Sequence, residues 1–183
     1  MSNDQVLMPS GVSQSVDANL PLQQYACRIK SAERHTPADP TKAANVNIKF
    51  KCEIMAPDIV TDPLTGGQVK ASGRSFEIYV SAAPHMRNFE DSFATLGKLG
   101  LLMPEGGFTI DHVVRLASKG DVFFMCLIIT VPEFYTTKDM NGNDVPVMIE
   151  GKPYLKGFRI KLPDSKQIGQ RIPTPPGFVP PAF

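Results

Sequence analysis

Apolar and polar residues alternate with a period of two in several short stretches of the chain. The clearest stretch covers residues 46–54, in which five apolar positions alternate with four polar ones. The apolar set is Val46, Ile48, Phe50, Cys52 and Ile54, and the polar set is Asn47, Lys49, Lys51 and Glu53. Because successive side chains of a strand point to opposite faces, this pattern predicts a strand with one buried and one solvated face. The same alternation predicts strands at residues 25–30 and 75–81.

Other patterns predict the remaining elements. Apolar residues recur at helical spacing between residues 88 and 99, which predicts one helix there. Residues 121–131 are apolar on both parities, as in a central strand that is covered on both faces. A last strand is predicted at residues 154–162, and the Asn141-Gly142 pair before it predicts a hairpin turn.

The composition indicates where the folded domain begins and ends. Seventeen prolines and fourteen glycines favour short strands and loops over long helices. Residues 1–20 are small and polar, and we expect a flexible N-terminal arm there. Residues 163–183 hold six prolines, which lack the amide donor that a helix or central strand needs, and we expect an extended C-terminal tail. The folded domain is then residues 21–162, a mainly β structure with one helix.

Charge is balanced overall but uneven along the chain. Lysine and arginine total 19 against 18 acidic residues, so the net charge of +1 gives no global argument for nucleic acid or membrane. Residues 25–52 nevertheless hold six basic and two acidic residues, and residues 152–171 hold six and one. Within the predicted strands the basic residues occupy the polar parity: Arg28, Lys30, Lys49, Lys51, Arg159 and Lys161. If these strands are sheet neighbours, they form one basic surface suited to phosphates; the alternative is a solvated sheet face whose lysines discourage aggregation.

Three tyrosines lie where a base could stack on them. Tyr79 occupies the polar parity of its strand, Tyr135 begins the long connection, and Tyr154 opens the last strand. Exposed aromatic rings are what non-specific binding of single strands requires. Half-burial on a sheet face is the alternative for Tyr79.

Signals for catalysis are weak. The patterns HExxH, GxSxG, GxxxxGK[ST] and GxGxxG do not occur, and the three histidines lack ligand spacing. Three separated cysteines are expected to be buried free thiols rather than a disulfide framework. No signal peptide or membrane-spanning run is found in the sequence. We therefore expect a cytoplasmic protein that is not an enzyme, uses no cofactor or metal, and does not bind membranes.

The layout resembles the OB fold, and more specifically the single-stranded DNA-binding proteins of phages. The matching segments are QYACRIKSAERH, NVNIKFKCEIMAP, GRSFEIYVSA, NFEDSFATLGKLGL, KGDVFFMCLIITV and YLKGFRIKLP, which cover about residues 22–162. The resemblance implies a five-stranded OB-like barrel that binds single strands across one basic, aromatic face. The contacts that it implies are Arg28, Lys30, Lys49, Lys51, Arg74, Tyr79, Tyr135, Tyr154, Lys156, Arg159 and Lys161.

Two functional hypotheses follow. The first is sequence-independent binding of single-stranded DNA in phage replication or recombination. Under this hypothesis the chain can also form a homo-oligomer. Many proteins of this kind end in an acidic tail whose terminal phenylalanine recruits replication or recombination proteins; here Phe183 is present but the acidic run is not. The second is a β-rich virion or assembly protein that uses its arm and tail for subunit contacts.

Overall fold

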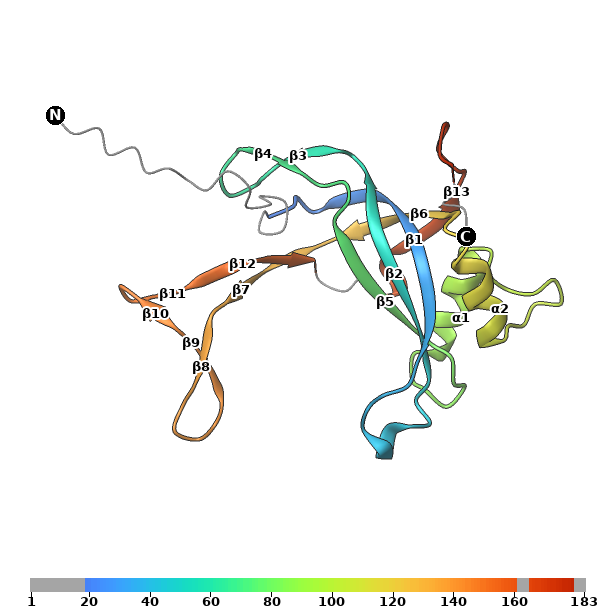
Figure 1. Ribbon diagram of the computed structural model, residues 1–183, viewed down its shortest axis with the longest axis horizontal. Coiled ribbons are helices and arrows are strands. Elements are labelled where there is room, and N and C mark those ends of the chain that lie inside the picture. The colour runs from blue at the N-terminus through green and yellow to red at the C-terminus, as the bar shows by residue number, and fades with distance from the viewer. Residues whose placement is uncertain (1–18, 161–164, 180–183) are drawn as a thin grey trace.

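The structure is a computed structural model, and it describes residues 19–160 and 165–179 (Figure 1). Among these residues, five antiparallel strands form the central sheet, in the spatial order β13-β6-β1-β2-β5. Their bounds are Gln23–His35 (β1), Asn47–Ala56 (β2), Ser75–Ser81 (β5), Val122–Ile128 (β6) and Ile168–Ile172 (β13). The mainly β fold and the strands expected at 25–30, 46–54, 75–81 and 121–131 are thus confirmed.

One face of the sheet forms the hydrophobic core. Alternate residues of β1, β2 and β5 are buried on this face, as their period of two predicts; they include Cys27, Ile29, Ile48, Phe50, Cys52, Ile78 and Val80. All three cysteines are buried free thiols, as expected. Burial raises the pKa of Cys126 to about 12, so this thiol is not ionised at neutral pH.

The sheet is not a closed barrel, so the expectation of a barrel is corrected. Helix α1 (Phe89–Lys98) accounts for the open edge. Closure would require the edge strands β5 and β13 to pair, and in the described part of the chain they do not. Instead α1 packs against both edge strands. Lys98 Nζ donates to the carbonyl of Ile168 at 3.4 Å, and Lys166 pairs with Asp91 at 3.4 Å. The helix therefore occupies the gap that strand pairing would close.

A second helix, α2 (Ile110–Ala117), lies within the described residues where none was predicted. It begins after Thr109, whose hydroxyl accepts a hydrogen bond from the backbone N–H of His112. Val113 and Ala117 are buried against the sheet. Its eight residues include β-branched ones with modest helix propensity, so packing and the cap stabilise it more than propensity does. Neither of the helices in residues 19–160 is long and apolar enough to cross a membrane.

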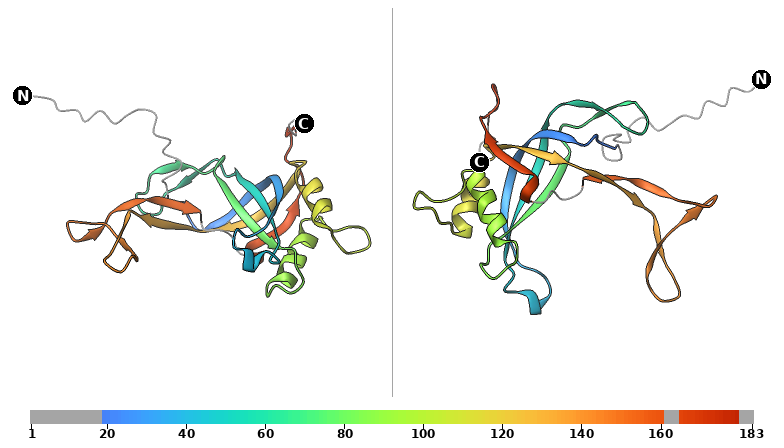
Figure 2. Two further views of the ribbon diagram at one scale, coloured as in Figure 1. Left: turned by 60° about the horizontal axis from the view of Figure 1, so that its bottom comes forward. Right: turned by 180° about the vertical axis from the view of Figure 1, so that it is seen from behind.

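The connection between β6 and β13 forms a β ribbon, residues 130–160, that projects from the sheet on the side away from the helices (Figures 1 and 2). Its stem pairs β7 (Thr130–Phe134) with β12 (Leu155–Ile160). Two short hairpins complete it: β8 (Thr136–Lys138) with β9 (Asp144–Pro146), and β10 (Met148–Ile149) with β11 (Lys152–Pro153). The Asn141-Gly142 turn joins β8 to β9, with Gly142 at φ +82°. A separate hairpin, β3 (Ile59–Thr61) with β4 (Gln68–Lys70), joins β2 to β5.

Two boundaries predicted from the sequence are revised. The strand expected at 154–162 exists as β12, but it pairs within the ribbon and not in the central sheet. The fifth sheet strand is β13, which lies in the segment expected to be a proline-rich tail. Ile168 is buried in the core, and the absence of a side chain at Gly169 allows close approach to the Met125 carbonyl. The prolines of that segment flank β13 and leave its five residues free to pair.

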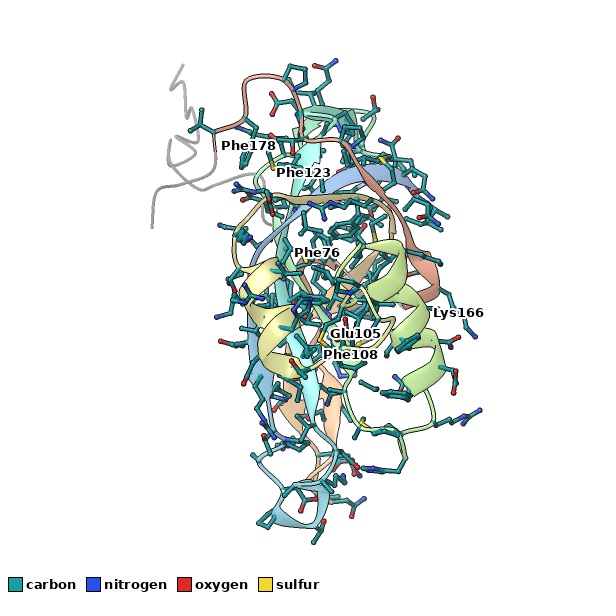
Figure 3. The ribbon with its side chains drawn as sticks, turned by 90° about the vertical axis from the view of Figure 1, so that its right-hand side faces the viewer. Phe76, Glu105, Phe108, Phe123, Lys166 and Phe178 are labelled. Atoms are coloured by element: carbon teal, nitrogen blue, oxygen red, sulfur yellow. The ribbon has the colours of Figure 1, made fainter. Side chains whose placement is uncertain are left out.

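The C-terminal segment also covers the other face of the sheet. Phe123 and Phe124 are adjacent in β6 and both are fully buried. Phe124 belongs to the core, whereas Phe123 faces the opposite side and meets Phe178 edge-on, with ring centroids 4.9 Å apart (Figure 3). This arrangement fits the prediction of a central strand covered on both faces.

Candidate nucleic-acid interface

The face of the sheet opposite the core carries most of the predicted basic contacts. We call it the polar face, made of Arg28, Lys30, Glu33, Lys49, Lys51, Glu53, Ser75, Glu77 and Tyr79. Strands β1, β2 and β5 are neighbours, so four predicted cations, Arg28, Lys30, Lys49 and Lys51, do gather there. Lys156 and Arg159 do not join them, because β12 lies in the ribbon.

The polar face is ion-paired rather than strongly basic. Lys49 Nζ lies 2.9 Å from a carboxylate oxygen of Glu77 and 3.4 Å from one of Glu33. Lys51 also pairs with Glu33, and both Arg28 and Lys30 pair with Glu53. Four cations against three glutamates leave a charge of +1 on this face. The expected single basic surface is therefore wrong, since the sheet register places a glutamate beside each cation.

The ion pairs of Lys49 shift the pKa values of three of these groups toward their charged forms. The ammonium of Lys49 lowers the pKa of the Glu77 carboxyl, and the lysines at 49 and 51 lower that of Glu33. In return, the hydrogen bond to Glu77 raises the pKa of Lys49. A phosphate that binds Lys49 would have to compete with two carboxylates. The sequence does contain a signal for these ion pairs, because Glu53 and Glu77 occupy the same polar parity of the strands as the lysines.

Tyr79 is half-buried on the polar face and is already partnered. Its hydroxyl donates to Glu77 Oε2 at 2.9 Å. The ring meets the edge of His35, with centroids 5.1 Å apart and planes at 72°. Burial, and then the hydrogen bond to Glu77, raise the pKa of Tyr79. The alternative interpretation of Tyr79, half-burial on a sheet face, matches this environment.

A hollow of about 360 Å³ opens on the sheet beside these residues. Its lining includes the side chains of Lys30, Lys51 and Glu77, with Ser31 and Ser75 beside them. The volume is near the lower end of the range for small-molecule sites, about 300–1,000 Å³. Cys52 and Phe76 complete the lining, so the hollow combines charged and hydroxyl groups with apolar surface.

The ribbon brings together two of the predicted stacking residues. Tyr135 and Tyr154, nineteen positions apart in sequence, stack with ring centroids 4.7 Å apart and planes at 24°. They lie where the stem divides into its two hairpins. Backbone hydrogen bonds from Tyr135 to Tyr154, from Val147 to Tyr135 and from Tyr154 to Val147 join the three branches. The tyrosines remain 45% and 46% exposed, so the pair presents aromatic surface to solvent.

Arg159 lies on the same face of the ribbon as the tyrosine pair. It is in register with Val131, and strand alternation places Val131, Glu133 and Tyr135 on one face. The guanidinium of Arg159 pairs with Glu133 at 3.0 Å. Lys156 is exposed at a bulge in β12. The face of the ribbon that carries Tyr135 and Tyr154, here called the tyrosine face, therefore combines two rings with the Arg159–Glu133 ion pair farther along the stem.

Three other predicted contacts have different fates. Arg74 is buried and donates to the carbonyl of Phe158, so it connects the sheet to the ribbon and is not accessible to a DNA strand. Its expected role as a contact is corrected accordingly. Lys161 and Phe183 lie outside the described residues.

The sequence analysis missed two contacts, one made by Arg28 and one made by Phe134. The Arg28 guanidinium lies 4.7 Å from the centre of the Phe178 ring. Phe134 faces Leu155 across the ribbon stem, and both side chains are exposed. Neither contact has a local signal, because each joins segments far apart in sequence.

In the described ranges no group of three or more histidine, cysteine or acidic side chains could hold a metal ion.

No protein-family model matches this chain, and no curated protein sequence does either.

Proposed function

We propose that this chain binds single-stranded DNA without sequence preference, with bases stacking on the exposed Tyr135–Tyr154 pair of the ribbon. The observation that carries the proposal is this pair: two stacked aromatic rings, each nearly half exposed, on the same face of a projecting ribbon as Arg159. Every base has a π-face, so stacking of this kind tolerates any sequence.

The strand order supports the same function. An OB-type sheet opened between its third and fifth strands has the spatial order fifth-fourth-first-second-third, which is the order β13-β6-β1-β2-β5. The helices lie between the third and fourth strands of that series, and the ribbon lies between the fourth and fifth. In OB folds, the connection between the fourth and fifth strands and the face of the second and third bind oligonucleotides.

The electrostatics of the polar face bear on how DNA would bind. With a charge of +1 and each cation paired to a glutamate, that face supplies little net attraction for phosphates. In this proposal, base stacking on the ribbon therefore contributes more to the affinity for DNA than phosphate binding by the basic surface that the sequence predicted. Phage replication or recombination is the proposed setting, on the resemblance alone.

Fluorescence anisotropy with a labelled oligo-dT of about 30 nucleotides tests the proposal, at low and high salt and with duplex DNA as competitor. Replacing both tyrosines by alanine should weaken binding about tenfold or more, since stacking contributes roughly 1–3 kcal/mol per base. The matched control replaces both by phenylalanine, which keeps the rings and should retain the affinity. No binding of wild type at low salt would contradict the proposal, as would equal binding by the alanine variant.

A subunit-contact role is the second candidate function, and one observation favours it. Of the eleven large apolar side chains that are exposed among the described residues, seven lie on the ribbon: Phe134, Tyr135, Met140, Met148, Ile149, Tyr154 and Leu155. Such concentrated apolar exposure is typical of an interaction surface.

A further inference from the structure

The ribbon is a surface that its own domain leaves uncovered. Its strands pair with one another, and its links to the body are at its root, where Arg74 donates to the Phe158 carbonyl and Ile160 packs against the core. From there it extends away from the sheet (Figure 2). A two-stranded ribbon without a packed face is marginally stable in water, so covering one face would stabilise it.

One face of the ribbon stem is apolar. Leu155 is in register with Phe134 and Phe158 with Pro132, so these four side chains lie on one side of the stem. The stacked tyrosines point to the other side, because each is next in sequence to Phe134 or Leu155. Phe134 and Leu155 are 38% and 43% exposed. Past the fork, Met148 is in register with Pro153 and continues this side at 55% exposure, whereas its neighbour Ile149 points to the other side.

The charge of the ribbon argues for a copy of itself as the occupant. Residues 130–160 carry four basic and four acidic side chains, a net charge of zero. Lys138 pairs with Asp144 and Arg159 with Glu133 within the ribbon. Two copies related by a two-fold axis present the same surface to each other, and a neutral surface with both signs can meet itself without net repulsion. A strongly charged partner would gain no such complementarity.

Prolines determine how two ribbons can meet. Each of the three ribbon pairings contains one: Pro132 in β7, Pro146 in β9 and Pro153 in β11. Proline cannot donate to a further strand, and on edges it opposes strand-to-strand addition. The contact is therefore made by side chains across the apolar face, and substitution of those side chains tests it.

We propose that two copies of this chain associate through the apolar faces of their ribbons, with the Phe134–Leu155 pair at the centre. The three apolar side chains at positions 134, 148 and 155 expose on the order of 250 Å² per copy, well below the ~800 Å² per partner of a standard interface. The dimer is accordingly weak and depends on concentration. It needs no DNA, and it leaves the tyrosine face open.

Sedimentation velocity of the full chain without nucleic acid, from about 1 to 100 µM, tests this association in the range of a micromolar dimer. Wild type should shift from monomer to dimer, and Leu155→Glu should remain a monomer. The matched control is Leu64→Glu, an equally drastic change at a leucine that is 68% exposed in the turn between β3 and β4. It should dimerise like wild type. A wild type that stays monomeric, or a Leu155→Glu variant that dimerises equally, overturns the proposal.

Cross-linking provides a second measurement that does not depend on a disruptive charge. The native cysteines are buried, so Leu155→Cys adds one accessible thiol to the ribbon. A short bis-maleimide should link two such chains, and Leu64→Cys should give little dimer under the same conditions. Equal dimer yields from the two variants overturn the proposal. Oligo-dT binding by Leu155→Glu tests the proposed function separately. A variant that no longer dimerises but still binds DNA shows that DNA binding does not depend on the dimer.

Discussion

The guanidinium of Arg28 lies 4.7 Å from the centroid of the Phe178 ring and also pairs with the Glu53 carboxylate. Phe178 in turn meets Phe123 edge-on and covers it on the side opposite the core. A residue of the C-terminal segment thus completes the burial of a central strand. With 13% of its side chain exposed, Arg28 is the least available of the four cations of the polar face.

Replacing Phe178 by alanine should lower the free energy of unfolding by roughly 1–3 kcal/mol. The change removes an aromatic pair, about 0.5–1.5 kcal/mol beyond area burial, and a cation–π contact of about 0.5–1 kcal/mol. Urea denaturation measures the effect. Val179→Ala is the control, because Val179 is 82% exposed and its loss should change stability by less than about 0.5 kcal/mol. Equal stabilities of the two variants would show that Phe178 does not pack on the sheet.

Neutralising Glu33 and Glu77 together (E33Q/E77Q) should strengthen DNA binding at low salt, under the proposed function. These carboxylates occupy Lys49 and Lys51, and their removal frees both ammonium groups for phosphates. Each lysine that gains a phosphate should steepen the slope of log K against log salt by about 0.7 for a single strand. Anisotropy titrations at several salt concentrations measure this slope.

The control for that experiment is E90Q/E105Q, which changes the net charge equally in and beside α1 (Glu105 is labelled in Figure 3). A long-range charge effect would act similarly in both variants, whereas direct contact changes the slope in E33Q/E77Q alone. If both slopes match wild type, DNA does not reach the lysines of the polar face.

The ion pairs of Lys49 should make stability depend on pH in the acid range. Glu77 and Glu33 have pKa values below their ordinary value of 4.5 in the folded state. A carboxyl of this kind contributes stability above its unfolded pKa, and the contribution is lost as the pH falls through the folded value. The free energy of unfolding should therefore decrease below about pH 4.5.

Lys49→Met should flatten this dependence, because the methionine cannot stabilise either carboxylate. Urea denaturation at pH 7, 5, 4 and 3 compares the variant with wild type. Lys119→Met, at an exposed position after α2, should retain the wild-type profile. A Lys49→Met profile identical in shape to that of wild type would mean that the two glutamates do not depend on Lys49.

Thr109→Ala should destabilise the protein by about 1 kcal/mol through loss of the α2 cap. Thr109→Ser keeps a hydroxyl and should cost only a small fraction of that. Hydrogen exchange of α2 amides, together with urea denaturation, locates the effect. If alanine and serine variants are equally stable, the hydroxyl of Thr109 does not contribute to the helix.

Helix α2 and the ion pairs illustrate why parts of this structure escape a sequence-based prediction. A short helix such as α2 depends on one capping hydroxyl and on the burial of two side chains. That burial exists only once the sheet has formed. The charges of the polar face could be assigned to a face from parity, but their pairing depends on strand register. Lys49 meets both Glu33 and Glu77 because β2 lies between β1 and β5.

The sequence alone determined four of the five central strands, the first helix and the buried thiols, since alternation and helical spacing are local properties of the chain. Tertiary structure decided which strands became neighbours. It moved β12 with Arg159 into the ribbon, brought β13 into the sheet, and stacked Tyr135 on Tyr154. These outcomes depend on contacts between residues distant in sequence, and their free energies arise only from packing and hydrogen bonds formed in the folded chain.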